Sequence, residues 1–205
     1  MVHLLALLEK RGTIIYMSHE AVIEYYNQCH VDYRILWRSH QNHCIHFGYF
    51  DDDHDSHRLA LPNMNRELAK RTEISSDDYV LDAGCGVGGS SMWLAEKKGA
   101  RVLGINIQPL HLKLATEEAK QRGLTGQVSF EELNYCDSDL PENSFDVVWA
   151  LESVCHCEDK SAFIKEAFRV LKPGGRIMVG DFFQFQRDLN GDEQQRMKYL
   201  SLIHI

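Results

Sequence analysis

The stretch "VLDAGCGVGGSS", residues 80–91, decides which fold this chain adopts. A short apolar run leads into a glycine-rich turn, in which Gly84, Gly86 and Gly89 match the pattern GxGxxG. Glycines let the backbone turn sharply, and their missing side chains let a ligand approach the N–H groups at the start of the next helix. The stretch therefore predicts a strand, a ligand-binding turn and a helix, although dinucleotide-binding dehydrogenases carry the same pattern.

Apolar runs and amphipathic runs alternate along the chain from residue 79 onward. Pro109 opens one amphipathic run, and Gly99 and Gly123 follow two of them, as expected at helix boundaries. We expect strands at 79–84, 101–107, 128–134, 144–151 and 176–183, and helices at 90–99, 109–123 and 160–171. This alternation indicates βαβ units. The predicted fold class is α/β, a Rossmann-like parallel sheet with helices on both faces.

Two residues near the glycine turn bear on the ligand it holds. Asp82 stands two residues before the first glycine, where a carboxylate would hold an ammonium group but repel a pyrophosphate. Dehydrogenases carry an acidic residue about 20 residues further on, which grips the ribose. Here the next predicted strand ends in "GINI", with Asn106 in that place. Both observations disfavour a dinucleotide.

Several motifs, in order along the chain, carry a resemblance to a known family. The segments "VLDAGCGVGGSS", "LPENSFDVVWALES" and "FRVLKPGG" resemble the class I S-adenosylmethionine (SAM)-dependent methyltransferases, over residues 79–183. The segment "LESVCHC" (151–157) resembles the E-x-x-x-H segment of one small-molecule branch, and "IHFGYFD" (45–51) resembles its H-x-G-Y/F-F/Y-D motif. That branch includes sterol, tocopherol and cyclopropane-fatty-acid-synthase-like methyltransferases.

The resemblance implies SAM as the cofactor and assigns its contacts. The acid and glycines of the turn would line the methionine end, and the segment after the second strand would face the ribose and adenine. After the third strand, the Asn134 carbonyl and the Tyr135 N–H would bind the adenine. The implied contacts are Asp82, Gly84, Cys85, Gly86, Gly88, Asn106, Ile107, Gln108, Asn134, Tyr135 and Leu151. Purely structural roles, a bare tight turn and an Asn106 that caps the next helix, are the alternatives.

The stretch "LESVCHCEDK", residues 151–160, first suggests a metal site. Consecutive Cys155, His156 and Cys157 do not converge as zinc ligands do, so we predict no metal. The stretch leaves the carboxyl end of the fourth strand, where ligands bind in open parallel sheets. Glu152 and His156 are four residues apart and would share one face of a helical turn, toward the transferred methyl group. There they would remove a proton or stabilise a cation, unless they only hydrogen-bond to hold the loop.

The segment "IHFGYFDDDHD", residues 45–55, is predicted to fold over the cofactor as a lid. Aromatic rings attract a sulfonium cation and exclude water from the transfer. His46, Phe47 and Tyr49 are the candidates for these roles. Together with Glu152 and His156, His46 and Tyr49 complete the predicted catalytic group. The alternative is plain core packing of an N-terminal helical layer.

Three segments make up the predicted domain organisation. Residues 1–16 are an uninformative extension, and residues 17–72 are an N-terminal helical cap or lid with helices at 18–29 and 58–72. Residues 73–205 are the SAM-binding domain. The family normally closes its sheet with two further strands, which the remaining sequence does not contain, so we expect the domain to be truncated at its C-terminus. A bare fifth strand would make the chain unstable alone or join it into a homodimer.

Composition narrows the function classes. The formal net charge of −8 argues against nucleic acid or an anionic membrane surface, because phosphate binding needs clustered Lys and Arg. Six scattered cysteines without a CxxC pair indicate a reducing cytoplasm and not a disulfide framework. The N-terminal apolar run is too short to span a bilayer, so no stable membrane insertion is expected.

These observations favour a SAM-dependent enzyme that methylates carbon or oxygen of a small lipophilic acceptor, of the sterol or prenylated phenol type. Three alternatives remain. The acceptor is a small amine, or the enzyme methylates a soft element with help from Cys44, Cys155 and Cys157, or the chain binds SAM without catalysis.

Overall fold

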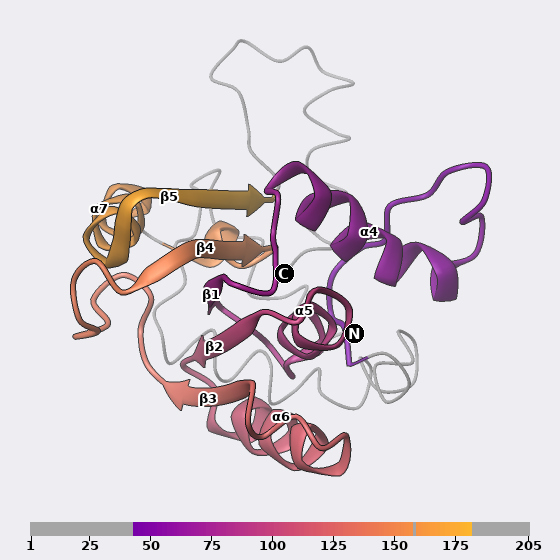
Figure 1. Cartoon of the computed structure of the whole chain (residues 1–205), viewed down its shortest axis with the longest axis horizontal. Helices are drawn as coiled ribbons and strands as arrows, with labels where there is room; N and C mark the ends of the chain where they lie inside the picture. The colour runs from indigo at the N-terminus through magenta and orange to yellow at the C-terminus, as the bar shows by residue number, and fades with distance from the viewer. Residues whose placement is uncertain (1–42, 158, 182–205) are drawn as a thin grey trace, which may run out of the picture.

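The computed structural model describes residues 43–157 and 159–181 of the 205-residue chain. Within these ranges the chain forms one five-stranded sheet in the order β3-β2-β1-β4-β5, and every pair of neighbouring strands is parallel (Figure 1). The predicted helix at 18–29 and the predictions for residues 1–16 and the C-terminal tail lie outside the described residues.

The elements follow the alternation expected from the sequence. The strands are β1 (Tyr79–Ala83), β2 (Arg101–Asn106), β3 (Val128–Glu132), β4 (Phe145–Leu151) and β5 (Leu171–Gly180). The helices are α4 (His57–Arg71), α5 (Gly89–Lys98), α6 (Pro109–Gln121), α7 (Lys160–Val170) and the short 3-10 helix η1 (Val154–His156). The prediction of an α/β parallel sheet is confirmed.

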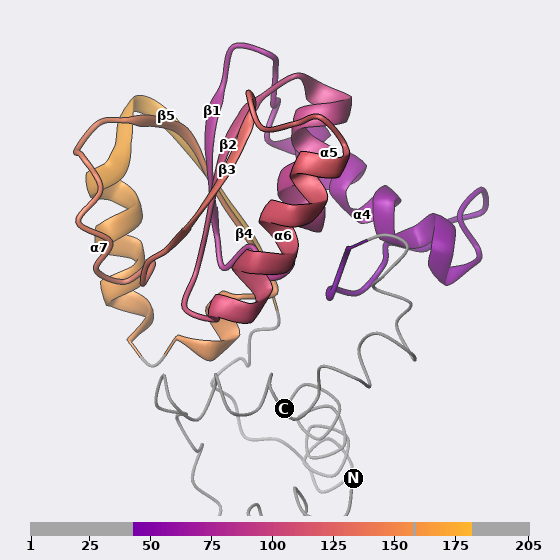
Figure 2. The same cartoon turned by 90° about the horizontal axis from the view of Figure 1, so that it is seen from below.

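Helices cover both faces of the sheet, with α4, α5 and α6 on one side and α7 on the other (Figure 2). Successive residues of one strand enter opposite core layers, because side chains alternate along a strand. In β1, for example, Val80 packs in the layer that includes Met92 of α5, and Leu81 packs in the layer that includes Phe163 of α7. The two layers explain why the strands read as continuous apolar runs.

The strand order reverses at β1, whose neighbours are β2 on one side and β4 on the other. The connections from β1 and from β4 therefore leave in opposite directions, and a crevice opens at the carboxyl ends of these strands. Ligand sites of open α/β sheets lie in this crevice. The glycine turn after β1 and the segment after β4 both lie there.

The start of β5 differs from the sequence expectation. The strand was expected from residue 176, after a loop, but it begins at Leu171, directly after α7. Leu171 pairs with Phe145, and the next pairing joins Arg176 to Val147, so the residues between form an irregularity inside the strand. Pro173 in this stretch has no N–H to donate to a ladder, which breaks the pairing.

Candidate functional site

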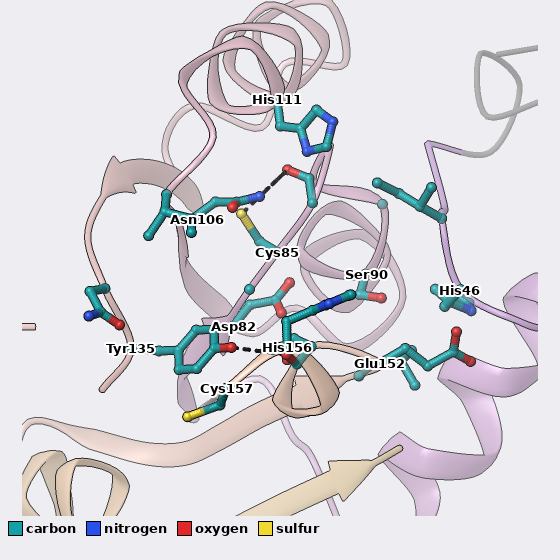
Figure 3. A pocket seen from close by; sticks show the side chains of 18 of the residues that line it. His46, Asp82, Cys85, Ser90, Asn106, His111, Tyr135, Glu152, His156 and Cys157 are labelled. Atoms are coloured by element: carbon teal, nitrogen blue, oxygen red, sulfur yellow. Dashed lines mark hydrogen bonds between the residues drawn. The ribbon is translucent and has the colours of Figure 1, made fainter. Parts of the chain in front are cut away.

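A cavity of about 400 Å³ opens at the carboxyl ends of the strands, a size typical of small-molecule sites (Figure 3). Its wall combines the glycine turn after β1 and the segments that follow β2, β3 and β4, with residues 43–46 on the remaining side. In Figure 3, Asp82 lies in the middle of the view, between Tyr135 and Glu152. Segments that are distant in sequence thus meet around one cavity.

The glycine turn is held tightly at the cavity wall. The N–H groups of Gly84 and Cys85 donate to the Ile105 carbonyl at 2.9 and 3.0 Å. Gly84 has φ +88°, and a Cβ there would collide with the Ser153 side chain, whose hydroxyl donates to the Ala83 carbonyl at 2.6 Å. Only glycine fits this position, since an L side chain rarely adopts the conformation and would also displace Ser153.

Asp82 is a buried carboxyl group in the cavity wall, with 2% of its surface exposed. The Ser91 hydroxyl, in the first turn of α5, donates to its Oδ2 at 2.5 Å. Burial raises the pKa of Asp82 to about 7, although the hydrogen bonds from Ser91 oppose that rise. A cation placed beside Asp82 would favour the ionised form, so the site is suited to an ammonium group.

Asn106, the last residue of β2, and Ile107 also line the cavity. Asn106 Nδ2 donates to the Gly86 carbonyl at 3.4 Å, and its Oδ1 accepts from the Gln108 N–H at 3.2 Å. The Gln108 side chain caps α6 by accepting from the Leu110 N–H at 3.3 Å. Asn106 therefore lies at the cavity and also takes part in the turn before α6.

Asn134 and Tyr135 form the wall after β3. Asn134 Oδ1 accepts from the Cys136 N–H at 2.9 Å, so this carbonyl already has one partner and keeps one lone pair for a ligand. The Tyr135 hydroxyl donates to the Ser153 carbonyl at 2.9 Å, and its ring packs edge-on against Phe163. The predicted adenine contacts of both residues stay predictions.

Three predicted site residues lie outside the cavity wall. Gly88 is the N-cap of α5, where a Cβ would meet the Phe130 ring at 2.7 Å, so it serves close packing against β3. Gln108 caps α6. Tyr49 is 40% exposed, and its backbone N–H donates to the Ala60 carbonyl at 3.0 Å. Phe47, the other aromatic candidate, is also not among the cavity residues.

Glu152 and His156 both line the cavity, but not from a shared helical turn as expected. Glu152 has φ +50°, and its N–H donates to the Gly180 carbonyl at 2.7 Å, which keeps it at the end of the sheet. The helical turn, η1, begins only at Val154. Because this hydrogen bond holds Glu152 at the end of the sheet, the i, i+4 argument for one common face does not apply.

The Glu152 carboxylate joins two segments that are 105 residues apart. Its Oε1 accepts from the Phe47 N–H at 2.9 Å. Burial raises the pKa of Glu152 to about 7, and the nearby Asp181 adds to the rise, while the Phe47 hydrogen bond opposes it. Residues 43–51 overlap the predicted lid at 45–55 and are called the lid segment from here on, and Glu152 anchors this segment to the end of β4.

His46 is a buried, neutral imidazole in the cavity wall, 6% exposed. Burial lowers its pKa to about 4. Its Nδ1 lies 2.8 Å from the Phe47 carbonyl, which only accepts, so Nδ1 carries the proton. The other ring nitrogen, Nε2, is then a hydrogen-bond acceptor, and it has no partner within residues 43–157 and 159–181.

The lid segment packs on α4 through Gly48. A Cβ at Gly48 would lie 2.5 Å from the Ala60 Cβ and 2.7 Å from its carbonyl carbon. Asn63 of α4 donates from Nδ2 to the Tyr49 carbonyl and to Asp51 Oδ2, both at 2.8 Å. Gly48 and Asp51, the glycine and the acid of the H-x-G-Y/F-F/Y-D motif, therefore attach the lid segment to α4.

Gly48→Ala is expected to lower the free energy of unfolding by about 2 kcal/mol, because the added methyl overpacks the contact with α4. Chemical denaturation with constant m-value measures the change. Gly126→Ala is the matched control, since a Cβ at Gly126 would have no neighbour within 4 Å, and it should change stability by less than about 0.5 kcal/mol. Equal effects of the two substitutions would contradict the packing role of Gly48.

Sequence reasoning missed several cavity residues, among them His43, Ser153 and His111. A Cβ at Gly89, the last glycine of the GxGxxG pattern, would collide with the His43 carbonyl. This glycine thus makes room for the lid segment. Ser153 lay within the quoted motif, whereas no spacing in the sequence signals the positions of His43 and His111.

The cysteines around η1 make contacts within the protein. The Cys155 N–H donates to Asp181 Oδ2 at 2.8 Å, and burial raises the pKa of the Cys155 thiol. Cys157 lies against Cys136, with 2.9 Å between the two Sγ atoms. In the part of the chain that the structure describes, no group of three or more His, Cys, Asp or Glu side chains is placed to hold a metal ion. Nor does any helix there have the length and apolar character needed to cross a membrane.

Comparison with known proteins agrees with this geometry. Residues 81–179 match the family described as "Methyltransferase domain". The chain is 34% identical over 172 residues to methyltransferase GfsG of Streptomyces halstedii, and this match covers 83% of this chain and 60% of the relative. It is 33% identical over 172 residues to the chloroplastic tocopherol O-methyltransferase of Arabidopsis thaliana, with 78% and 48% covered.

Among solved structures, that of the [4+2]-cyclase SpnF superposes with a TM-score of 0.76 at 26% identity, and covers 88% of this chain and 67% of that one. The chain spans about half to three fifths of the length of the two curated relatives. With the parallel sheet, the glycine turn and the cavity at its carboxyl edge, these matches show that residues 81–179 of the chain form a SAM-dependent methyltransferase domain.

Proposed function

We propose that this protein uses SAM to methylate oxygen or carbon of a small lipophilic acceptor, of the sterol or prenylated phenol type. The observation that carries the proposal is that two chemically different sets of groups line one cavity. Asp82 and the glycine turn form one part of the wall, and Glu152 and His46 lie together to one side of Asp82, while His156 lies close to Asp82 (Figure 3). The first set suits the cationic amino-acid end of a cofactor, and the glutamate and the two histidines suit the handling of a proton.

The residues present fit SAM. Asp82 would hold the ammonium group, and Gly84 lets the backbone approach the ligand without a side chain between them. Asn106 and Asn134 offer amide groups to the ribose and the adenine. When bound, SAM supplies an electrophilic methyl group on a sulfonium centre.

The protein contributes mainly positioning, because an in-line displacement needs aligned reactants more than strong acid–base catalysis. The lid segment, anchored by Glu152, would exclude water from the cavity. A neutral His46 with an acceptor nitrogen at Nε2, or His156 on η1, would accept the proton that a hydroxyl acceptor loses.

The alternatives receive less support. A cysteine-assisted reaction needs thiolates, but burial raises the pKa of Cys44 to about 12 and also raises that of Cys155. An amine acceptor would use the same cavity. A SAM-binding protein without methyl transfer stays the alternative from another class.

Two measurements test the proposal. Titration calorimetry with S-adenosylhomocysteine should show binding at one site per chain. Incubation with methyl-labelled SAM and a panel of prenylated phenols, sterols and small amines should label a phenol or sterol first. Absence of binding would overturn the proposal, and labelling of amines alone would replace its acceptor class.

A further inference from the structure

Cys136 and Cys157 form a contact that the proposed methyl transfer does not use. Their Sγ atoms are 2.9 Å apart, although the residues are 21 positions apart in sequence and belong to different segments. Cys136 follows β3 and Cys157 follows η1. Both side chains line the cavity.

We propose that Cys136 and Cys157 are a redox-sensitive pair that closes to a disulfide across the wall of the cofactor cavity. An S–S bond measures about 2.05 Å, so the sulfur atoms have to approach by only about 0.9 Å. The two segments are also linked close by, because the Tyr135 hydroxyl of one donates to the Ser153 carbonyl of the other at 2.9 Å.

The reaction balances with a peroxide as the oxidant. Cys136 is only half-buried, whereas Cys157 is buried, so the peroxide reaches Cys136 first. The Cys136 thiolate attacks one peroxide oxygen, which yields a sulfenic acid and hydroxide. The Cys157 sulfur then attacks the sulfenic sulfur, and water leaves. In total, two thiols and one hydrogen peroxide give one disulfide and two waters.

The two steps should differ in rate. Burial and the contact with Cys157 hold the pKa of Cys136 above its usual range, so few molecules carry the thiolate at neutral pH. The first step is therefore slow. The second is fast, because the resolving thiol is already in contact.

Closure would change the cavity. The bond would draw together the wall segment of Tyr135, a predicted adenine contact, and the η1 turn that carries His156. Loss of one well-placed hydrogen bond to the ligand costs about 1.4 kcal/mol, or about tenfold in affinity. Only this consequence rests on the proposed function, since the disulfide itself does not need a ligand.

Peptide mapping tests the disulfide directly. The full chain is reduced, desalted, treated with hydrogen peroxide, blocked with N-ethylmaleimide and cleaved after glutamate. Cleavage separates Cys136 in peptide 133–142 from Cys155 and Cys157 in peptide 153–158. We expect these two peptides joined by a disulfide in the wild type and in Cys155→Ser, and separate in Cys136→Ser. A bridge to any other cysteine, or over-oxidised Cys136 without a bridge, would overturn the proposal.

Calorimetry with S-adenosylhomocysteine tests the consequence. The oxidised wild type should bind about tenfold more weakly than the reduced protein, and dithiothreitol should restore the affinity. Cys136→Ser should bind equally before and after peroxide. If peptide mapping shows the disulfide but the affinity for S-adenosylhomocysteine is unchanged, the proposed effect on the cavity is refuted. Failure of the reduced chain to bind would instead refute the proposed function and leave the mapped disulfide standing.

Discussion

Asp82→Asn is expected to weaken the binding of S-adenosylhomocysteine by about a hundredfold at pH 8. The buried carboxylate would lose its charge, and removing one partner of a buried, hydrogen-bonded charge pair costs about 2–5 kcal/mol. Asparagine keeps nearly the same shape and can still accept from Ser91, so the fold should persist. Titration calorimetry measures the affinity, and thermal unfolding checks the stability of the variant.

The affinity for S-adenosylhomocysteine should also depend on pH, which tests the role of Asp82 more directly than the loss of affinity alone. Burial raises the pKa of Asp82 to about 7, so the ligand-free carboxyl is mostly protonated at pH 6 and mostly ionised at pH 8. Since the ammonium group of the ligand binds the ionised form, affinity should rise by about tenfold from pH 6 to pH 8, with release of a proton on binding. Asp82→Asn should remove most of that rise.

The exposed Asp77 offers a matched control. Asp77→Asn removes one negative charge from the chain outside the cavity wall and should leave both the affinity and its pH profile unchanged. If Asp82→Asn bound as tightly as the wild type at pH 8, the pairing of Asp82 with the ammonium group would be refuted. A surviving tenfold rise in the variant would assign the titration to another group, such as Glu152.

Glu152→Ala is expected to lower kcat/KM for methyl transfer by about thirtyfold, whereas Glu152→Gln should keep most of it. The alanine variant leaves the Phe47 N–H without its partner at 2.9 Å, and a lost buried hydrogen bond costs about 2 kcal/mol. Glutamine retains an oxygen that accepts from the same N–H. The anchoring of the lid segment therefore predicts a large difference between two variants that both lack the carboxylate.

Amide hydrogen exchange reports on the anchor without an assay for the acceptor. Exchange at Phe47 should be much faster in Glu152→Ala than in the wild type, and nearly unchanged in Glu152→Gln. Equal losses of activity in the two variants, with Phe47 still protected, would show that Glu152 acts through its ionisation and not as an anchor.

Much of the fold could be predicted because its signals are local. Val80 and Leu81 enter opposite core layers, so β1 must be apolar on both of its faces. A strand of this kind is a continuous apolar run in the sequence, which is easy to recognise. Pro109 and Gly99 mark helix ends where the structure has them. The start of β5 was less predictable, since the irregularity around Pro173 depends on pairing with β4.

Site residues could be predicted where a single stretch of sequence forms that part of the cavity wall. They were harder to predict where the wall is formed by contacts between distant stretches. Asp82 and Gly84 lie at the cavity because the turn after a parallel strand always faces the carboxyl edge. Tyr49 was predicted to contact the cofactor, but the packing of Gly48 against Ala60 ties this part of the lid segment to α4 and leaves Tyr49 outside the cavity wall. Glu152 was expected on a helical turn, but its hydrogen bond to Gly180 keeps it at the end of the sheet.

By itself, the sequence determined the α/β architecture, the glycine turn and the methyltransferase domain, because side-chain periodicity, glycine conformation and motif order are properties of contiguous residues. Only the tertiary structure decided which side chains share the cavity. It brought Phe47 to Glu152 across 105 positions, and Cys136 to Cys157 across 21. Such contacts arise from how the lid segment and the loops after β3 and β4 pack together, and no spacing within one segment encodes that packing.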